Sequence, residues 1–115
     1  MTSLREDAQK IIDAALKTAL PDTAVKQALG RIPFPSAGGR LVLVSIGKAA
    51  YTMASAASQV LGDRISQGIV ITKYGHAGEP LPRIAIREAG HPVPDENTVG
   101  ATGQALDMVK GLRKE

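Results

Sequence analysis

The sequence predicts an α/β fold: a Rossmann-like, three-layer arrangement around a parallel sheet, of which this chain supplies part of a domain. Three apolar segments, 41–46, 69–72 and 84–88, have the length and composition of buried strands. Helical segments over 48–61 and from about 95 to 112 alternate with them. Strands that alternate with helices at this spacing pair in parallel through right-handed crossovers, so a layered sheet is expected.

An N-terminal helical hairpin is expected over residues 1–30, ahead of an α/β body over residues 40–115. Ser3 and Glu6 form the pattern of a capping box, which predicts the start of the first helix. Pro21 ends that helix, because the residue before a proline avoids the α region. A second, shorter helix is then expected to start with Asp22 as its cap and to stop at Gly30.

The first helix carries an apolar stripe. Leucine, isoleucine and alanine recur every three or four residues, at Leu4, Ala8, Ile11, Ile12, Ala15, Leu16 and Ala19. This is the spacing of one helical face. We expect that face to pack on the α/β body.

The predicted sheet is small for its class. Three parallel strands leave at least one edge exposed, and proteins normally cover or pair such an edge. The helix expected over 48–61 is rich in alanine and serine, which allows a close approach to the sheet. We therefore expect either part of a larger domain or a chain that forms a homodimer.

Composition narrows the classes of partner. The formal net charge of +3 is spread along the 115 residues, and aromatic residues make up 3% of them, which argues against a nucleic-acid partner. The absence of cysteine excludes disulfides, thiolate metal sites and cysteine nucleophiles. No apolar stretch approaches the ~20 residues of a membrane span. No apolar signal region follows Met1, so a cytoplasmic location without a membrane partner is expected.

The most informative segment is residues 45–49 (Ser-Ile-Gly-Lys-Ala), directly after the first strand. In an open α/β sheet, ligands bind at this carboxyl edge of the strands. Gly47 lets the backbone approach a ligand, the following helix offers free N–H groups, and Lys48 adds a positive charge. A cation at a helix N-terminus opposes the helix dipole. An anionic ligand, phosphate or carboxylate, is therefore expected there; a lysine that only faces solvent is the alternative.

This turn is neither of two common nucleotide-binding motifs. A P-loop needs a glycine five residues before the Gly-Lys pair and a serine or threonine after it, where this chain has Val42 and Ala49. The glycines of the dinucleotide fingerprint are also missing.

Two further loops are expected at the same edge. Residues 72–80 follow the second strand, and Lys73, Tyr74 and His76 are candidates for a mobile wall of the site, or for a plain surface loop. His76 and His91 lie in two different loops and have no third metal ligand close to either of them in the sequence. They make a poor metal site, and no metal site is expected.

The loop over 89–95 contains His91 between a glycine and two prolines that stiffen it. His91 could bind an oxyanion or act as an acid or base. The alternative is a structural hydrogen bond, with Asp95 or Asn97 capping the last helix.

Three segments together resemble one family: residues 45–50 (Ser-Ile-Gly-Lys-Ala-Ala), 68–76 (Gly-Ile-Val-Ile-Thr-Lys-Tyr-Gly-His) and 88–95 (Glu-Ala-Gly-His-Pro-Val-Pro-Asp). In this order and spacing they resemble the N-terminal domain of the class II glycerate kinases, which carry a C-terminal MOFRL domain and are often labelled hydroxypyruvate reductases. The missing dinucleotide fingerprint argues against a reductase.

The resemblance implies phosphorylation of glycerate to 2-phosphoglycerate with ATP and Mg²⁺. It assigns Lys48 to the active site as the catalytic residue, and we expect Gly47, Lys48 and His91 to bind substrate. Members of the family are several times longer and continue into a glycine- and serine-rich loop. An N-terminal fragment that is inactive on its own is therefore expected.

Two other classes remain open. A phosphosugar-binding or isomerase module of the SIS type also runs strand, glycine-lysine turn and small-residue helix, but it usually has serine at the position of Ala49. A non-enzymatic domain that dimerises through the Leu4–Leu20 helix is the third interpretation.

Overall fold

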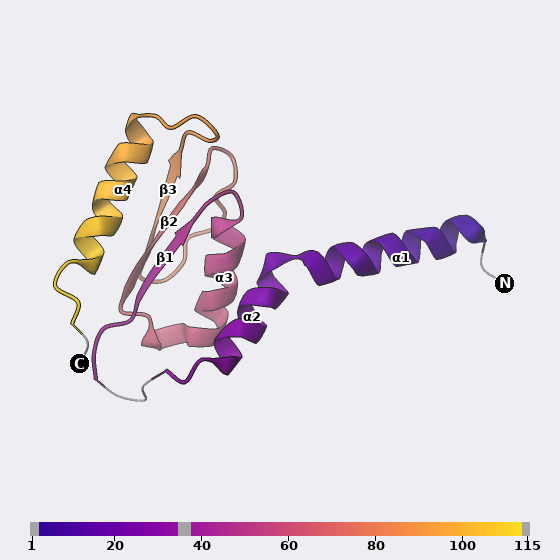
Figure 1. Cartoon of the computed structure of the whole chain (residues 1–115), viewed down its shortest axis with the longest axis horizontal. Helices are drawn as coiled ribbons and strands as arrows, with labels where there is room; N and C mark the ends of the chain where they lie inside the picture. Colours follow the sequence, from indigo (N-terminus) through magenta and orange to yellow (C-terminus); the bar gives the residue numbers. More distant parts are fainter. Residues whose placement is uncertain (1–2, 35–37, 114–115) are drawn as a thin grey trace.

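A computed structural model of the chain describes residues 3–34 and 38–113 and forms a three-layer α/β unit with one protruding helix (Figure 1). The strands β1 and β2 are joined through a helix, whereas β2 and β3 are joined by a loop. In chain order the elements are α1 (Leu4–Ala19), α2 (Pro21–Arg31), β1 (Val42–Ile46), α3 (Ala50–Leu61), the short 3₁₀ helix η1 (Gly62–Arg64), β2 (Gln67–Lys73), β3 (Ile84–Ala89) and α4 (Glu96–Val109). The predicted α/β class is confirmed.

The sheet is parallel throughout, in the order β1-β2-β3. Ile46 at the end of β1 lies beside Ile71 of β2, and Lys73 at the end of β2 lies beside Ala89 of β3. The ends of the three strands therefore meet at one edge of the sheet. Among the described residues, β2 is the central strand and has buried side chains on both faces, which explains its uninterrupted apolar sequence.

Helices cover both faces of the sheet (Figure 1). On one face the small side chains Ala50, Ala54 and Ala57 of α3 pack with Val70, and the partly buried apolar residues of α2 lie against this cluster. The small residues of α3 thus let the helix lie close to the strands, as the sequence predicts. On the other face lies a second buried cluster, in which the alanines of α4 pack with Ile69 and Ile71 of β2 and with Ala89 of β3.

The expectation that α1 packs on the α/β body is wrong. The capping box of Ser3 and Glu6 forms as predicted, with Ser3 N donating to Glu6 Oε2 at 2.8 Å. However, α1 has no buried residue and extends away from the body, which gives the molecule a longest dimension of 61 Å (Figure 1).

The two N-terminal helices also do not form the expected hairpin. Only Leu20 separates α1 from α2, and its backbone is extended. Antiparallel helix pairs use loops of 2–5 residues, so a single residue does not let α1 fold back on α2.

Helix ends differ from the sequence-based expectations by one or a few residues. The first helix ends at Ala19 and Leu20 is extended, as the following proline predicts, and Pro21 is itself the first residue of α2, a position where its missing N–H costs nothing. Leu20 rather than Asp22 is therefore the N-cap, and α2 continues past Gly30 to Arg31. Along the described residues, no helix combines the length and apolar character needed to cross a membrane.

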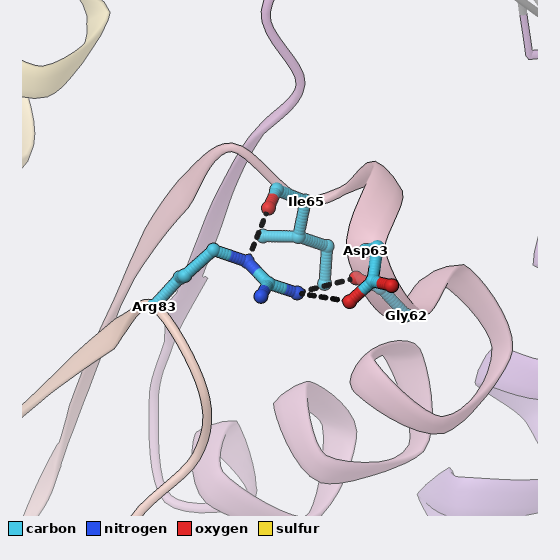
Figure 2. A network of polar contacts seen from close by, with 4 residues as sticks. All are labelled: Gly62, Asp63, Ile65 and Arg83. Atoms are coloured by element: carbon cyan, nitrogen blue, oxygen red, sulfur yellow. Dashed lines mark hydrogen bonds and ion pairs between the residues drawn. The ribbon is translucent and has the colours of Figure 1, made fainter.

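The amino edge of the sheet is held by Arg83 (Figure 2). Its Nε donates to the carbonyl of Ile65 at 2.8 Å, and its Nη2 donates to the carbonyl of Gly62 at 3.0 Å and lies 3.4 Å from Asp63 Oδ1. Arg83 itself has a positive φ of 61°. One side chain thus ties the end of α3 and η1 to the start of β3.

Candidate active site

Three loops converge at the carboxyl edge of the sheet, opposite the Arg83 network. The turn at residues 47–49 follows β1, the loop after Lys73 follows β2, and the loop over 90–95 follows β3 (Figure 1). The parallel register brings their starting points together. The sequence-based prediction that these loops share one edge is confirmed.

The backbone of the first turn is fixed by the neighbouring strand. Gly47 has φ +124°, its N–H donates to the carbonyl of Ile71 at 3.0 Å, and its carbonyl accepts from Ala50 N at 3.1 Å. The buried Thr72 hydroxyl donates to the carbonyl of Lys48 at 3.3 Å. Only glycine tolerates this φ without strain, so the turn depends on Gly47 for its shape.

The Lys48 side chain leaves this fixed backbone into solvent. Lys48 is exposed, and the two ion pairs found among the described residues, Arg83 with Asp63 and Lys110 with Asp107, lie elsewhere. A rigid backbone with an exposed, uncompensated ammonium group is suited to meet an anion.

The start of α3 adds to the positive potential. Among the described residues, α3 begins at Ala50 without a side-chain cap or an acidic residue in its first turn. By contrast, α1 and α4 both begin with a capping box. The first N–H groups of a helix have no partner within it, and they attract anions. Lys48 lies two residues before this helix rather than inside it. The N–H of Gly47 is used by β2 and that of Ala50 by the carbonyl of Gly47, so the first-turn donors without a hydrogen bond in the described part of the chain are those of Tyr51 and Thr52.

The second and third loops are tied to each other. The hydroxyl of Tyr74 donates to Asp95 Oδ2 at 2.6 Å and accepts from Asn97 Nδ2 at 2.8 Å. One residue further, Gly75 N donates to Glu88 Oε1 at 3.0 Å. These bonds connect the end of β2 with the end of β3 and the start of α4.

Asp95 is the centre of this connection. As the N-cap of α4 it accepts from Thr98 N at 3.0 Å, and it also accepts from Gly90 N at 3.1 Å. The hydrogen bond from Tyr74, followed by that from Gly90, lowers the pKa of Asp95 from 3.8 to about 2. The same bond to Asp95 raises the pKa of Tyr74. Asp95 is thus ionised at neutral pH and holds the third loop as a carboxylate.

The two histidines are exposed on their loops. His76 N donates to the carbonyl of Lys73 at 3.0 Å, which closes a turn, and the side chains of His76 and His91 make no hydrogen bond to another described residue. Between the two alternatives for the last helix, Asp95 rather than Asn97 is the cap. The structure thus brings the loops of Lys48 and His91 to one edge but shows no contact between these side chains.

Sequence reasoning missed the bond from Tyr74 to Asp95 and Asn97. The available signal is that both loops leave neighbouring parallel strands, so that a long hydroxyl-bearing side chain can reach from one to the other. Within residues 3–34 and 38–113, no three His, Asp or Glu side chains gather in a way that could hold a metal ion.

The fold and the carboxyl edge of the sheet together define the class of protein. It is an α/β protein whose glycine-lysine turn presents a positive charge at the carboxyl ends of parallel strands. The chain belongs to the family described as "Domain of unknown function (DUF4147)", whose model matches residues 7–115.

Relatives give this family a chemical context. The chain is 44% identical over 112 residues to the D-glycerate 2-kinase of Thermotoga maritima, covering 97% of this chain and 26% of that protein. It is 43% identical over 110 residues to a protein of Agrobacterium vitis with a hydroxypyruvate reductase name, covering 96% of this chain and 24% of the relative. This chain therefore spans about a quarter of the length of these relatives.

A solved structure shows the same fold. The crystal structure of glycerate kinase from Thermotoga maritima matches with a TM-score of 0.88 at 43% identity, over 96% of this chain and 26% of the other. The resemblance that the three sequence segments indicate is therefore confirmed by both comparisons.

Proposed function

We propose that this chain forms the part of a glycerate 2-kinase that carries the anion-binding lysine. Similarity over nearly the whole chain to proteins named D-glycerate 2-kinase is the observation that carries the proposal. The exposed Lys48 beside the uncapped start of α3 supports it, because this edge offers what an anionic substrate needs.

The reaction would transfer the γ-phosphoryl group of ATP to the 2-hydroxyl of glycerate. The hydroxyl oxygen forms a bond to the γ-phosphorus and loses its proton, while the bond from that phosphorus to the bridging oxygen breaks and leaves ADP. Phosphoryl transfer depends on positioning and on neutralising charge. In this proposal Lys48 meets the carboxylate of glycerate or the transferring group, Gly47 keeps the turn open, and His91 contributes to substrate binding from the third loop.

Mg²⁺ would neutralise the phosphates of the nucleotide. Because the described residues bring no set of three acidic or histidine side chains together, we assign no residue of this chain to the metal. The nucleotide-binding part and the MOFRL domain would lie in the portion of the relatives that has no counterpart here, and a cytoplasmic location would supply the ATP. The chain alone is expected to be inactive.

A chimera tests the proposal. Residues 1–115 replace the matched segment of the Thermotoga maritima enzyme, and ADP release is measured with D-glycerate and Mg-ATP for the chimera and for the 115-residue chain. Turnover by the chimera alone is expected. A chimera that melts cooperatively but does not phosphorylate glycerate contradicts the proposal. Binding of a sugar phosphate by that inactive chimera would favour the SIS-type module.

A further inference from the structure

The apolar stripe of α1 is exposed in the part of the chain that the structure describes. Its stripe is defined by Leu4, Ile11, Ile12 and Leu16 with the alanines between them. Leu4 is 90% exposed, Ile11 71% and Leu16 61%. Single exposed apolar residues are ordinary, whereas a continuous row along one helix face marks an interaction surface.

Energetics also require a partner for this helix. An isolated helix of about 15 residues is marginal in water, and most helical stability in proteins comes from packing of the apolar face. The capping box at Ser3 contributes locally, but it removes no apolar surface from water. The helix is thus formed while its apolar residues remain unburied.

Other exposed apolar surfaces indicate what kind of partner covers α1. Val44 and Ile46 are exposed on the edge strand β1, and Val99 and Leu106 are exposed on α4, which packs on the opposite face from α2 and α3 (Figure 1). A two-fold pair of identical chains buries one self-complementary patch. Surfaces on several sides of the molecule point instead to a larger partner that wraps the unit.

The length of the relatives gives a second indication of what covers α1. The family model begins at residue 7, so most of α1 belongs to the matched region. In the relatives, that region makes up 26% or less of the protein. About three-quarters of each of these relatives therefore lies outside the region that matches this chain.

We propose that the α1 stripe docks into an apolar groove on the remaining portion of the glycerate 2-kinase polypeptide. This inference rests on the proposed function for the identity of the partner. The groove would need a length of about 24 Å, the rise of a 16-residue helix. The helix would then be an arm that holds the Lys48-bearing unit to the rest of the enzyme, rather than a part of the core of this unit.

Hydrogen exchange tests the docking directly. Exchange of the α1 amides is measured in the 115-residue chain and in the chimera described above. In the chain alone α1 is expected to exchange rapidly at every protein concentration, and in the chimera at least about tenfold more slowly, because docking suppresses local opening.

A pair of double variants provides the control. Ile12→Gln with Leu16→Gln removes two large side chains of the stripe, and it should restore rapid exchange of α1 in the chimera. Lys10→Gln with Lys17→Gln introduces the same residue type on the opposite side of the same helix, and it should leave the protection unchanged. All four positions are exposed, so the α/β body is expected to fold in both variants.

Three outcomes would overturn the docking: equally fast exchange of α1 in chain and chimera, equal protection in both double variants, or protection in the chain alone that grows with its concentration. The last result would assign the stripe to a second copy. Activity separates this inference from the proposed function. A protected α1 in an inactive chimera removes only the kinase assignment, and an unprotected α1 in an active chimera removes only the docking.

Discussion

The two edges of the sheet are built in opposite ways. At the amino edge Arg83 satisfies two backbone carbonyls and approaches Asp63, so that its charge is used within the fold (Figure 2). At the carboxyl edge the backbone is equally well fixed around Gly47, but Lys48 and His91 are left exposed. Polar groups therefore stabilise one edge and remain available for a ligand at the other.

The residues that stabilise the fold and the residues that remain available for a ligand therefore lie at opposite ends of the strands. A substitution at the amino edge should change unfolding with little effect on ligand binding, and a substitution of an exposed side chain at the carboxyl edge should do the reverse. The carboxyl edge is also held by a hydrogen bond, because the hydroxyl of Tyr74 in the second loop donates to Asp95 in the third loop.

The largest effect is expected for Lys48→Ala. In the chimera, turnover of glycerate should fall by at least about a hundredfold, the usual loss when one donor that stabilises developing charge is removed. The melting temperature should not change, since the side chain is exposed. Lys110→Ala is the matched control, with a lysine that pairs with Asp107 away from this edge. Normal turnover in Lys48→Ala would remove the site assignment.

Gly68→Ala should destabilise the fold more than the substitutions at Arg83 and Tyr74 described below. A Cβ at this position would lie 2.9 Å from the carbonyl oxygen of Leu43 and 3.2 Å from Ile84 Cγ1, on the central strand near the amino edge. Strain of this kind costs about 1–3 kcal/mol, measured as a lower midpoint of urea unfolding. Gly103→Ala in α4, where a Cβ meets nothing within 4 Å, should instead stabilise by up to about 1 kcal/mol. Equal effects of the two substitutions would contradict the described packing.

Arg83→Ala should destabilise the chain by a smaller amount, about 1 kcal/mol, because its hydrogen bonds to carbonyls are partly exposed. Arg83→Gly loses the same bonds but has no penalty for the positive φ of 61°. It should therefore unfold at a higher denaturant concentration than Arg83→Ala. The reverse order would show that the backbone is not strained at this residue.

The smallest effect is expected for Tyr74→Phe, and it depends on pH. The pKa of Asp95 in the folded chain is about 2, below its ordinary value of 3.8. Its ionised form therefore stabilises the fold above about pH 4, and this contribution is lost as the pH falls toward 2. Removing the Tyr74 hydroxyl should raise this pKa and reduce the difference in melting temperature between pH 7 and pH 3. An unchanged acid profile would show that Tyr74 does not act on Asp95 in solution.

Much of the architecture follows from local signals in the sequence. The apolar runs, the glycine after β1 and the capping box at Ser3 place strands, turn and helices to within a few residues. Such signals act over a few neighbouring residues, so they can be read without knowing what surrounds them. The position of the Lys48 turn at the carboxyl edge also follows, because the turn comes directly after β1 in the sequence.

The course of α1 and the bond between Tyr74 and Asp95 depend on residues far apart in the chain. An apolar stripe predicts that a helix has a partner, but its periodicity is the same whether the partner is the adjoining sheet or another part of a longer protein. The sequence by itself therefore determined the elements and the charge at the carboxyl edge. Only the tertiary structure decided which surfaces meet, because packing brings together side chains that lie far apart in the sequence and local signals do not specify their contacts.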